Sequence, residues 1–256
     1  MLTLLLSVLV GVVLGLLGGG GSILTVPILL SAAKLPEREA IASSLFVVGV
    51  TSAAAVIGHA RRGNVDWRTG LLFASAGAAG AFAGGRASEL VPASWLILGF
   101  VAMMIGTGVA MLRGRGDGAE GRTPAVPTVL VTGAVLGFVT GLVGAGGGFV
   151  VVPALVLVGG LPMKKAVGTS LVVITLQTLA GFVGHAAHVS LDWPLTLAVT
   201  LAAVFGSGIG GLLSSRVPAS ALRRGFGVFV LGMAVWMTWQ QAHAPEVPAS
   251  AEVREH

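Results

Sequence analysis

The sequence contains no cysteine and no tyrosine, and it has few charged residues. The absence of cysteine excludes a disulfide-stabilised scaffold. Charged residues make up 10% of the 256 residues, whereas soluble domains carry roughly 25%, so one soluble domain of this length could not cover its surface. Intrinsic disorder is excluded by the hydrophobic content of 55%, because disordered chains are polar and highly charged. The composition therefore predicts a polytopic membrane protein, embedded in the lipid bilayer.

The chain carries 15 basic and 10 acidic residues, for a formal net charge of +5. In a soluble protein this excess could indicate nucleic-acid binding. Here the basic residues form short clusters between apolar blocks, as in the cytoplasmic loops of membrane proteins, and we expect no nucleic-acid partner. The segment 1–17 lacks the basic start and the cleavage site of a signal peptide, so we expect it to be retained.

Eight apolar blocks fill most of the chain, and six of them are close to the ~20 residues that cross a bilayer as a helix. The other two are longer, and glycines interrupt each of them, at 18–22 and at 144–148. We predict an all-α polytopic membrane protein, with ten membrane segments if short re-entrant arms are counted. The blocks are 1–33, 40–60, 69–88, 93–112, 126–160, 166–187, 192–214 and 220–240.

Two segments of the sequence are copies of one unit. Pro27 and Pro153 differ by 126 in number, and the same shift aligns further motifs without a gap. We predict a first repeat at 1–112, a polar linker at 113–125, a second repeat at 126–241 and a disordered tail at 242–256. The other aligned motifs are Gly15-Leu16-Leu17-Gly18 with Gly141-Leu142-Val143-Gly144, Leu35-Pro36 with Leu161-Pro162, Ser43-Ser44-Leu45 with Thr169-Ser170-Leu171, Gly58-His59-Ala60 with Gly184-His185-Ala186, and Asp66-Trp67 with Asp192-Trp193.

The distribution of basic residues favours one topology. If each broken block crossed the membrane once, basic loops would fall on both faces in similar numbers. If each block enters, turns at its glycines and returns, most basic residues share one face, which the positive-inside rule places in the cytoplasm. Both termini are then periplasmic and the two repeats are inverted, as in many secondary transporters. The residues on the shared face are Arg61, Arg62, Arg68, Arg113, Arg115, Arg122, Lys164, Lys165, Arg216, Arg223 and Arg224.

The glycine breaks predict an anion site made of backbone. A helix that resumes after a break has unpaired N–H groups and the positive end of its dipole at its first turn. We therefore expect Gly19, Gly20, Gly21 and Ser22 of the first break, with Ser22 as helix cap, to bind an anion together with Gly146, Gly147 and Gly148 of the second. The alternative is that these glycines only allow close helix packing. We expect that packing role for Gly77, Gly80, Gly84, Gly206, Gly210 and Gly211.

Polar residues inside apolar blocks are further candidates for substrate binding, because they are costly in a membrane. They are Ser43, Ser44, Thr169, Ser170 and Gln177, and the 126-residue shift pairs Gln177 with Thr51. The alternative is that Gln177 bonds a neighbouring helix and that the hydroxyls bond their own preceding turn.

Two histidines, His59 and His185, occupy equivalent places in the repeats and are candidates for proton coupling. The neighbouring Arg61 favours an interfacial position for His59. Asp66 and Asp192, each followed by Trp, are typical of a helix cap with an interfacial aromatic residue. The apolar blocks carry no acidic cluster for a metal, and the chain has no Walker, HExxH or credible GxSxG motif, so we expect no metal, no cofactor and no enzymatic activity.

The motif Gly15-Leu-Leu-Gly-Gly-Gly-Gly-Ser-Ile-Leu-Thr-Val-Pro27 resembles the sulfite exporter TauE/SafE family. The second copy, Gly141 to Pro153 followed by Leu161-Pro-Met-Lys-Lys-Ala-Val-Gly-Thr-Ser170, strengthens the resemblance, which covers nearly the whole chain apart from the linker and tail. The first copy departs from the family pattern, with Ala42-Ser43-Ser44 in place of Gly168-Thr169-Ser170. The resemblance implies a permease for sulfite, sulfoacetate or another organosulfur anion.

Together these observations predict a secondary transporter of a small oxyanion in the inner membrane, working by alternating access. Its partners would be a small organosulfur anion and the lipid bilayer, with a homodimer left open. An anion channel and a membrane subunit of a larger transport system remain alternatives.

Overall fold

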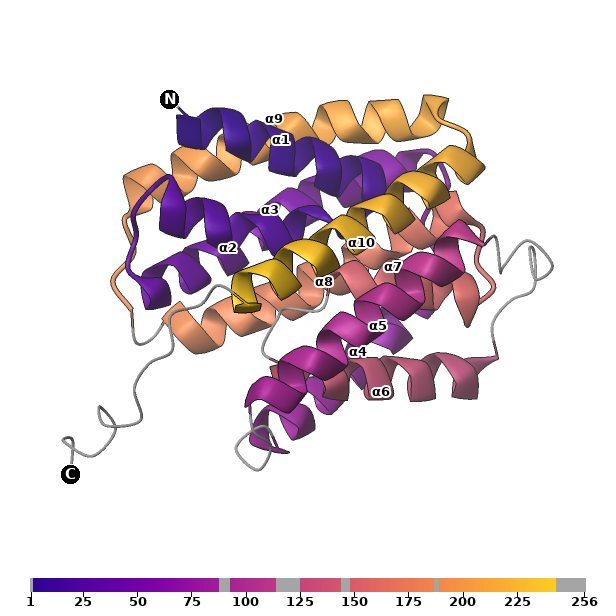
Figure 1. Cartoon of the computed structure of the whole chain (residues 1–256). Coiled ribbons are helices and arrows are strands. Elements are labelled where there is room, and N and C mark those ends of the chain that lie inside the picture. Colours follow the sequence, from indigo (N-terminus) through magenta and orange to yellow (C-terminus); the bar gives the residue numbers. More distant parts are fainter. Residues whose placement is uncertain (1, 88–92, 114–124, 144–147, 187–188, 243–256) are drawn as a thin grey trace.

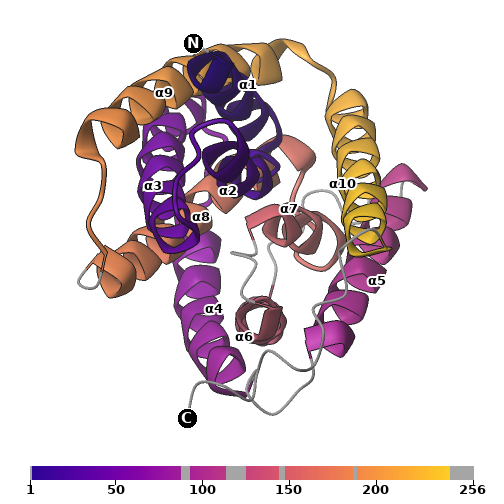
Figure 2. The same ribbon diagram turned by 60° about the vertical axis from the view of Figure 1, so that its left-hand side comes forward.

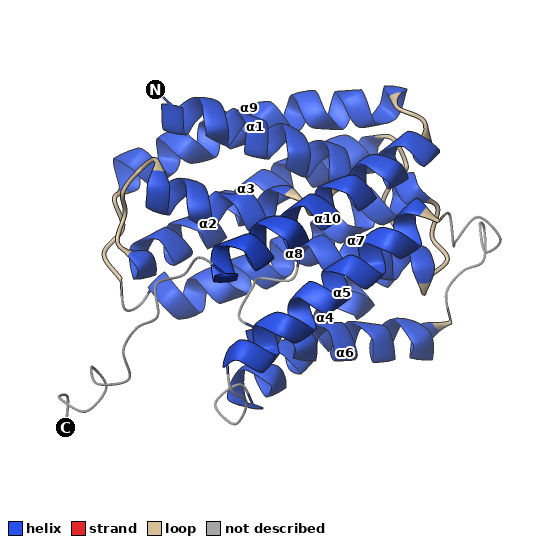
Figure 3. Cartoon of the chain, viewed as in Figure 1, coloured by secondary structure: helices blue, strands red, loops and turns tan. Residues whose placement is uncertain are grey.

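The computed structural model describes residues 2–87, 93–113, 125–143, 148–186 and 189–242. In these residues the chain forms ten α helices and no strand (Figures 1 and 3). The predicted all-α class is therefore confirmed. The helices of the first half are α1 (Leu2–Leu17), α2 (Gly21–Ser31), α3 (Glu37–Arg61), α4 (Trp67–Ala87) and α5 (Ala93–Leu112). Those of the second half are α6 (Val126–Val143), α7 (Gly148–Leu157), α8 (Met163–Ala186), α9 (Trp193–Arg216) and α10 (Ala219–Ala242).

The exterior of the helix bundle is apolar. Large hydrophobic side chains face outward on several helices, including Leu5 at 69% exposure, Leu201 at 70% and Val183 at 72%. Such a surface is unfavourable in water and suits the hydrocarbon core of a bilayer. Three described stretches are long and apolar enough to cross a membrane, namely Arg38–Arg61, Met163–Val183 and Trp193–Arg216. The fold is that of a multi-pass membrane protein.

The first apolar block forms a helical hairpin. The hydroxyl of Thr3 at the start of α1 donates to the carbonyl of Ala32 beyond the end of α2, at 3.3 Å. At the other end of the hairpin, Gly21 lies against Val10 and Leu14. The chain therefore turns at its glycines and returns, and the 11 residues of α2 span about 16 Å, roughly half the hydrocarbon thickness.

Glycines bring two pairs of helices into backbone contact, α1 with α9 and α4 with α6 (Figure 2). A Cβ atom added at these glycines would collide with a carbonyl oxygen of the partner helix, so even alanine does not fit. This is the packing role that small-residue spacing predicts. Between α1 and α9 the contacts are Gly11 with Ala203, Gly206 with Val8, and Gly210 with Val12. Between α4 and α6 they are Gly137 with Gly77, Gly80 with Ala134, and Gly84 with Phe138, which are the same pairs shifted by 126.

The contacts also fix helix directions. Helix α9 is parallel to α1 and to α3, because contacting residues follow the same order along the two helices of each pair. For α3 and α9, Ser43 meets Thr196 and Arg62 meets Gly211. Helix α4 is likewise parallel to α6 and to α8. Helices α3 and α8 are antiparallel, because Gly49 contacts Leu179 and Gly181 contacts Leu45. Helices α1, α3 and α9 therefore point one way, and α4, α6 and α8 point the other way.

The two ends of the bundle differ in charge. At one end, Arg62 donates to the carbonyl of Gly211 at 3.0 Å and Lys164 donates to that of Ser215 at 3.1 Å. We call this the basic end. At the opposite end, the backbone N–H of Asp192 donates to Glu39 at 2.7 Å. This grouping is the one expected if the first block turns back at its glycines.

Both predicted helix caps are confirmed. The Asp66 carboxylate accepts from the backbone N–H of Thr69 at 3.1 Å, and Asp192 accepts from that of Leu195 at 3.0 Å. Each cap satisfies one otherwise unpaired N–H group in the first turn of α4 or α9.

Candidate functional site

The first glycine break lies against helix α8. Gly18 has φ +75°, the left-handed region that glycine adopts without strain. A Cβ atom at this position would also lie 2.7 Å from both Ser170 Oγ and the carbonyl oxygen of Val167. The hydroxyl of Ser170 donates to the Gly18 carbonyl at 2.6 Å and fixes the turn in place.

The N-terminus of α2 meets the N-terminus of α7 inside the bundle. A Cβ atom at Gly19 would collide with the carbonyl of Gly148, and one at Gly148 would lie 2.9 Å from Ser22 Oγ. The structure thus brings Gly19, Ser22 and Gly148 of the predicted site together. Gly20 contacts Phe229, and Gly21 contacts α1. The predicted residues Gly146 and Gly147 lie outside the described part of the chain.

Ser22 does not cap α2, and that prediction was wrong. The cap position is Gly20, which is already in helical conformation, and no side chain caps this end. Ser22 instead lies within the helix and donates its hydroxyl to the carbonyl of Gly19 at 2.8 Å. The Ser22 hydroxyl thus donates to a carbonyl of the glycine break. The first backbone N–H groups of α2 have no hydrogen-bond partner within the helix.

The four other predicted hydroxyls have partners within the protein. Ser44 donates to the carbonyl of Ile41 at 2.7 Å, and Ser170 bonds Gly18 as described. Ser43 lies 3.2 Å from the hydroxyl of Thr196, and Thr169 accepts from the backbone N–H of Asp66 at 3.0 Å. Ser43 and Thr169 therefore lie in the contacts of α3 with α9 and of α8 with α4. Of these four, Ser170 lies against the first break.

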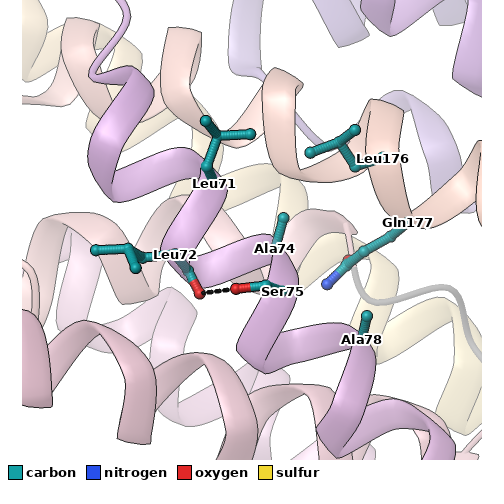
Figure 4. Close-up of a pocket in the computed structure, with 7 residues that line it drawn as sticks. All are labelled: Leu71, Leu72, Ala74, Ser75, Ala78, Leu176 and Gln177. Carbon is teal, nitrogen blue, oxygen red and sulfur yellow. Dashed lines mark hydrogen bonds between the residues drawn. The ribbon is translucent and has the colours of Figure 1, made fainter.

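Gln177 borders a cavity of about 450 Å³ between α4 and α8. Figure 4 shows its side chain extending from α8 toward Ser75 and Ala78 of α4. The rest of the lining is mainly apolar, from Leu71, Leu72, Ala74 and Leu176. The amide nitrogen approaches α4 at a glycine, because a Cβ atom at Gly77 would lie 2.6 Å from it.

His59 is buried between helices in the last turn of α3. Its side chain is 1% exposed, and Nε2 donates to the carbonyl of Gly15 in the last turn of α1 at 3.1 Å. Its Nδ1 atom has no hydrogen-bond partner among the described residues. Helices α1, α8 and α9 cover this face of α3: Gly168 contacts His59 Cβ, and a Cβ at Gly211 would lie 3.8 Å from Nε2. The side chain of His185 is outside the described part.

Two further side chains stand out in the middle of α3. Thr51 and Ser52 are buried, and neither hydroxyl has a hydrogen-bond partner among the described residues. The sequence marks Thr51 as the repeat equivalent of Gln177, whereas Ser52 was missed. Across the described chain, no group of three His, Cys, Asp or Glu side chains is placed to hold a metal ion.

Comparison with known proteins places this architecture in a family. The family model described as sulfite exporter TauE/SafE matches residues 3–237, nearly the whole chain. The chain belongs to the TauE/SafE family. It is therefore a membrane transporter, in agreement with its apolar exterior and with the glycine-broken helices that the family motif covers.

Similar proteins occur in bacteria and in Methanocaldococcus jannaschii. A probable membrane transporter protein of Xylella fastidiosa (strain 9a5c) is 37% identical over 91% of this chain and 92% of its own length. YdhB of Bacillus subtilis, also named a probable membrane transporter protein, is 24% identical over 87% of this chain and 94% of its own. MJ0441 of Methanocaldococcus jannaschii carries the same description, with 26% identity over 87% and 91%. No solved structure matches the chain.

Proposed function

We propose that this TauE/SafE protein is a secondary transporter that moves a small oxyanion, sulfite or an organosulfonate such as sulfoacetate, across the inner membrane by alternating access. The observation that carries the proposal is the meeting of the α2 and α7 N-termini at Gly19, Ser22 and Gly148. Helix N-termini bind anions through unpaired N–H groups and the positive end of the dipole.

The lack of buried charged side chains among the described residues supports an anionic substrate that is bound by backbone N–H groups. Among the described residues, no Asp, Glu, Lys or Arg side chain is buried. A bound oxyanion would therefore meet neither a fixed carboxylate that repels it nor a fixed cation that holds it too tightly for release. Backbone N–H groups of broken helices serve this purpose in other secondary transporters.

The helix directions support an inverted repeat. Helices α1 and α6, α3 and α8, and α9 and α4 are related by the 126-residue shift, and the members of each pair point in opposite directions. An inverted repeat places the two broken helices on either side of one midplane site. We propose that the basic end faces the cytoplasm and that both termini are periplasmic.

We further propose that energy comes from an ion gradient or from the gradient of the anion itself. His59 is the candidate for proton coupling, because its Nε2 donates to Gly15 while its Nδ1 atom has no hydrogen-bond partner among the described residues and can accept a proton. His185, its repeat equivalent, is the matching candidate in the second half.

Anion flux into proteoliposomes tests the proposed function. We expect Ser22→Leu to abolish counterflow of sulfite and sulfoacetate while the protein remains in the membrane, because a branched apolar side chain would fill the space where the two N-termini meet. Ser31→Leu is the matched control, since Ser31 is exposed at the far end of the same helix. Normal counterflow in Ser22→Leu would contradict the site. Flux without counterflow would favour a channel.

A further inference from the structure

Thr51 and Ser52 are exceptions to the way this protein satisfies its buried hydroxyls. A hydroxyl in a membrane helix normally donates to a carbonyl one turn earlier. The described chain follows this rule repeatedly: Thr25 donates to Gly21 at 3.1 Å, Thr178 to Ile174 at 2.7 Å and Thr200 to Thr196 at 2.7 Å. Thr51 is 1% exposed and Ser52 is 0% exposed, yet neither hydroxyl has a partner among the described residues.

Unpartnered buried hydroxyls are costly, and folded proteins retain few of them. Two in adjacent positions indicate a local demand for hydrogen bonds that the described residues do not meet. The 126-residue shift sharpens the contrast, because the equivalent of Ser52 is Thr178, which bonds its own preceding turn. The feature therefore belongs to this place in the bundle and not to the repeated unit.

The two hydroxyls share a face of α3 with residues of a buried cluster that also borders the helix N-termini. Val48 and Ala55, one turn before and one turn after them, belong to one buried cluster with Leu14 and Ile174. Leu14 lies against Gly21 at the start of α2, and Ile174 lies against Gly148 at the start of α7. Thr51 and Ser52 are three and four residues after Val48, so they share this face of α3.

We propose that Thr51 and Ser52 are the side-chain ligands of the transported oxyanion and complete the site formed by the N-termini of α2 and α7. The proposal rests on the anion transport proposed above. Each hydroxyl donates one hydrogen bond to an oxygen of the sulfite or sulfonate group, and the negative charge faces the positive ends of the two helix dipoles. The hydroxyls predicted from the sequence, Ser43, Ser44, Thr169 and Ser170, already have partners in the protein.

The test compares anion affinity and thermal stability in the full-length protein in lipid nanodiscs. Sulfite and sulfoacetate are titrated at constant sodium, and binding is followed by the shift in melting temperature. The variants are Thr51→Val, Ser52→Ala and the double variant, with Thr51→Ser as the version that keeps a hydroxyl. The matched controls are Thr200→Val and Ser207→Ala, whose buried hydroxyls bond the preceding turn of α9.

We expect the double variant to bind the anion about 10- to 100-fold more weakly, since hydrogen bonds to a charged group are lost. Its melting temperature without ligand should equal or exceed that of the wild type, because no internal hydrogen bond is removed. Thr51→Ser should bind the anion as the wild type does. The controls Thr200→Val and Ser207→Ala should keep wild-type anion affinity and have a lower melting temperature.

Wild-type affinity in the double variant would overturn the assignment and leave the transport proposal standing. A separate sodium titration without anion that shifts the melting temperature of the wild type but not of the double variant, with anion affinity unchanged, would also overturn it, because the hydroxyls would then be cation ligands. If the wild-type protein itself shows neither an anion-dependent shift nor counterflow, the proposed function fails, and this inference fails with it.

Discussion

Replacing Gly18 with alanine should destabilise the protein for two separate reasons. Its φ of +75° lies in the left-handed region, which costs a residue with a Cβ about 1–2 kcal/mol. The added Cβ would also lie 2.7 Å from Ser170 Oγ and from the Val167 carbonyl, and 2.9 Å from Val167 Cα. Two of these atoms are backbone of a packed helix and cannot move freely, so overpacking adds about 1–3 kcal/mol. The expected loss in the free energy of unfolding is about 2–5 kcal/mol.

Two glycines provide controls for this prediction. Gly63 has φ +69°, but nothing lies within 4 Å of an added Cβ, so Gly63→Ala should carry only the conformational cost of about 1–2 kcal/mol. Gly208 lies in α9 with open space around it, so Gly208→Ala should be neutral or raise stability by up to about 1 kcal/mol through helix propensity. The assay is reversible unfolding in mixed micelles with increasing SDS. Equal destabilisation by Gly18→Ala and Gly63→Ala would refute the contact of the first break with α8.

Two other predictions concern helix packing and coupling. Gly80→Ala should prevent stable accumulation of the protein in the membrane, because the added Cβ would collide with the Ala134 carbonyl. Gly232→Ala has open space around the added Cβ and should accumulate normally. Immunoblots of membrane fractions measure the accumulation, and normal levels of Gly80→Ala would contradict the α4–α6 contact. His59→Gln keeps a donor for the Gly15 carbonyl but cannot titrate, so anion flux should persist and lose its pH dependence. Arg62 is the nearby cation in that comparison and is left in place; an unchanged pH profile would exclude His59 as the coupling group.

Local features of the fold could be predicted from the sequence because they depend on neighbouring residues. A run such as Gly18 to Gly21 cannot stay regularly helical at low cost, and the helix breaks between Leu17 and Gly21. Asp66 and Asp192 were recognisable as caps because a short carboxylate before an apolar run suits an unpaired N–H group. The closely packed glycines of α4 and α9 were likewise visible from their spacing.

Features that depend on partner choice could not be predicted. Gly80 and Gly84 mark a face for close packing, but nothing in their spacing names α6 as the partner. The local sequence of His59 does not show that α1 and α9 cover its side chain. Thr51 and Ser52 carry side chains that usually bond their own helix, and only the tertiary structure shows that they do not.

The glycine contacts between α1 and α9 and between α4 and α6 cross from one half of the chain to the other. A polypeptide comprising residues 1–112 alone would therefore leave the glycine faces of both α1 and α4 uncovered. A second copy inserted in the opposite orientation would supply both missing partners, since its α4 would take the place of α9 and its α1 the place of α6. Each half of the chain thus covers the glycine faces of the other half.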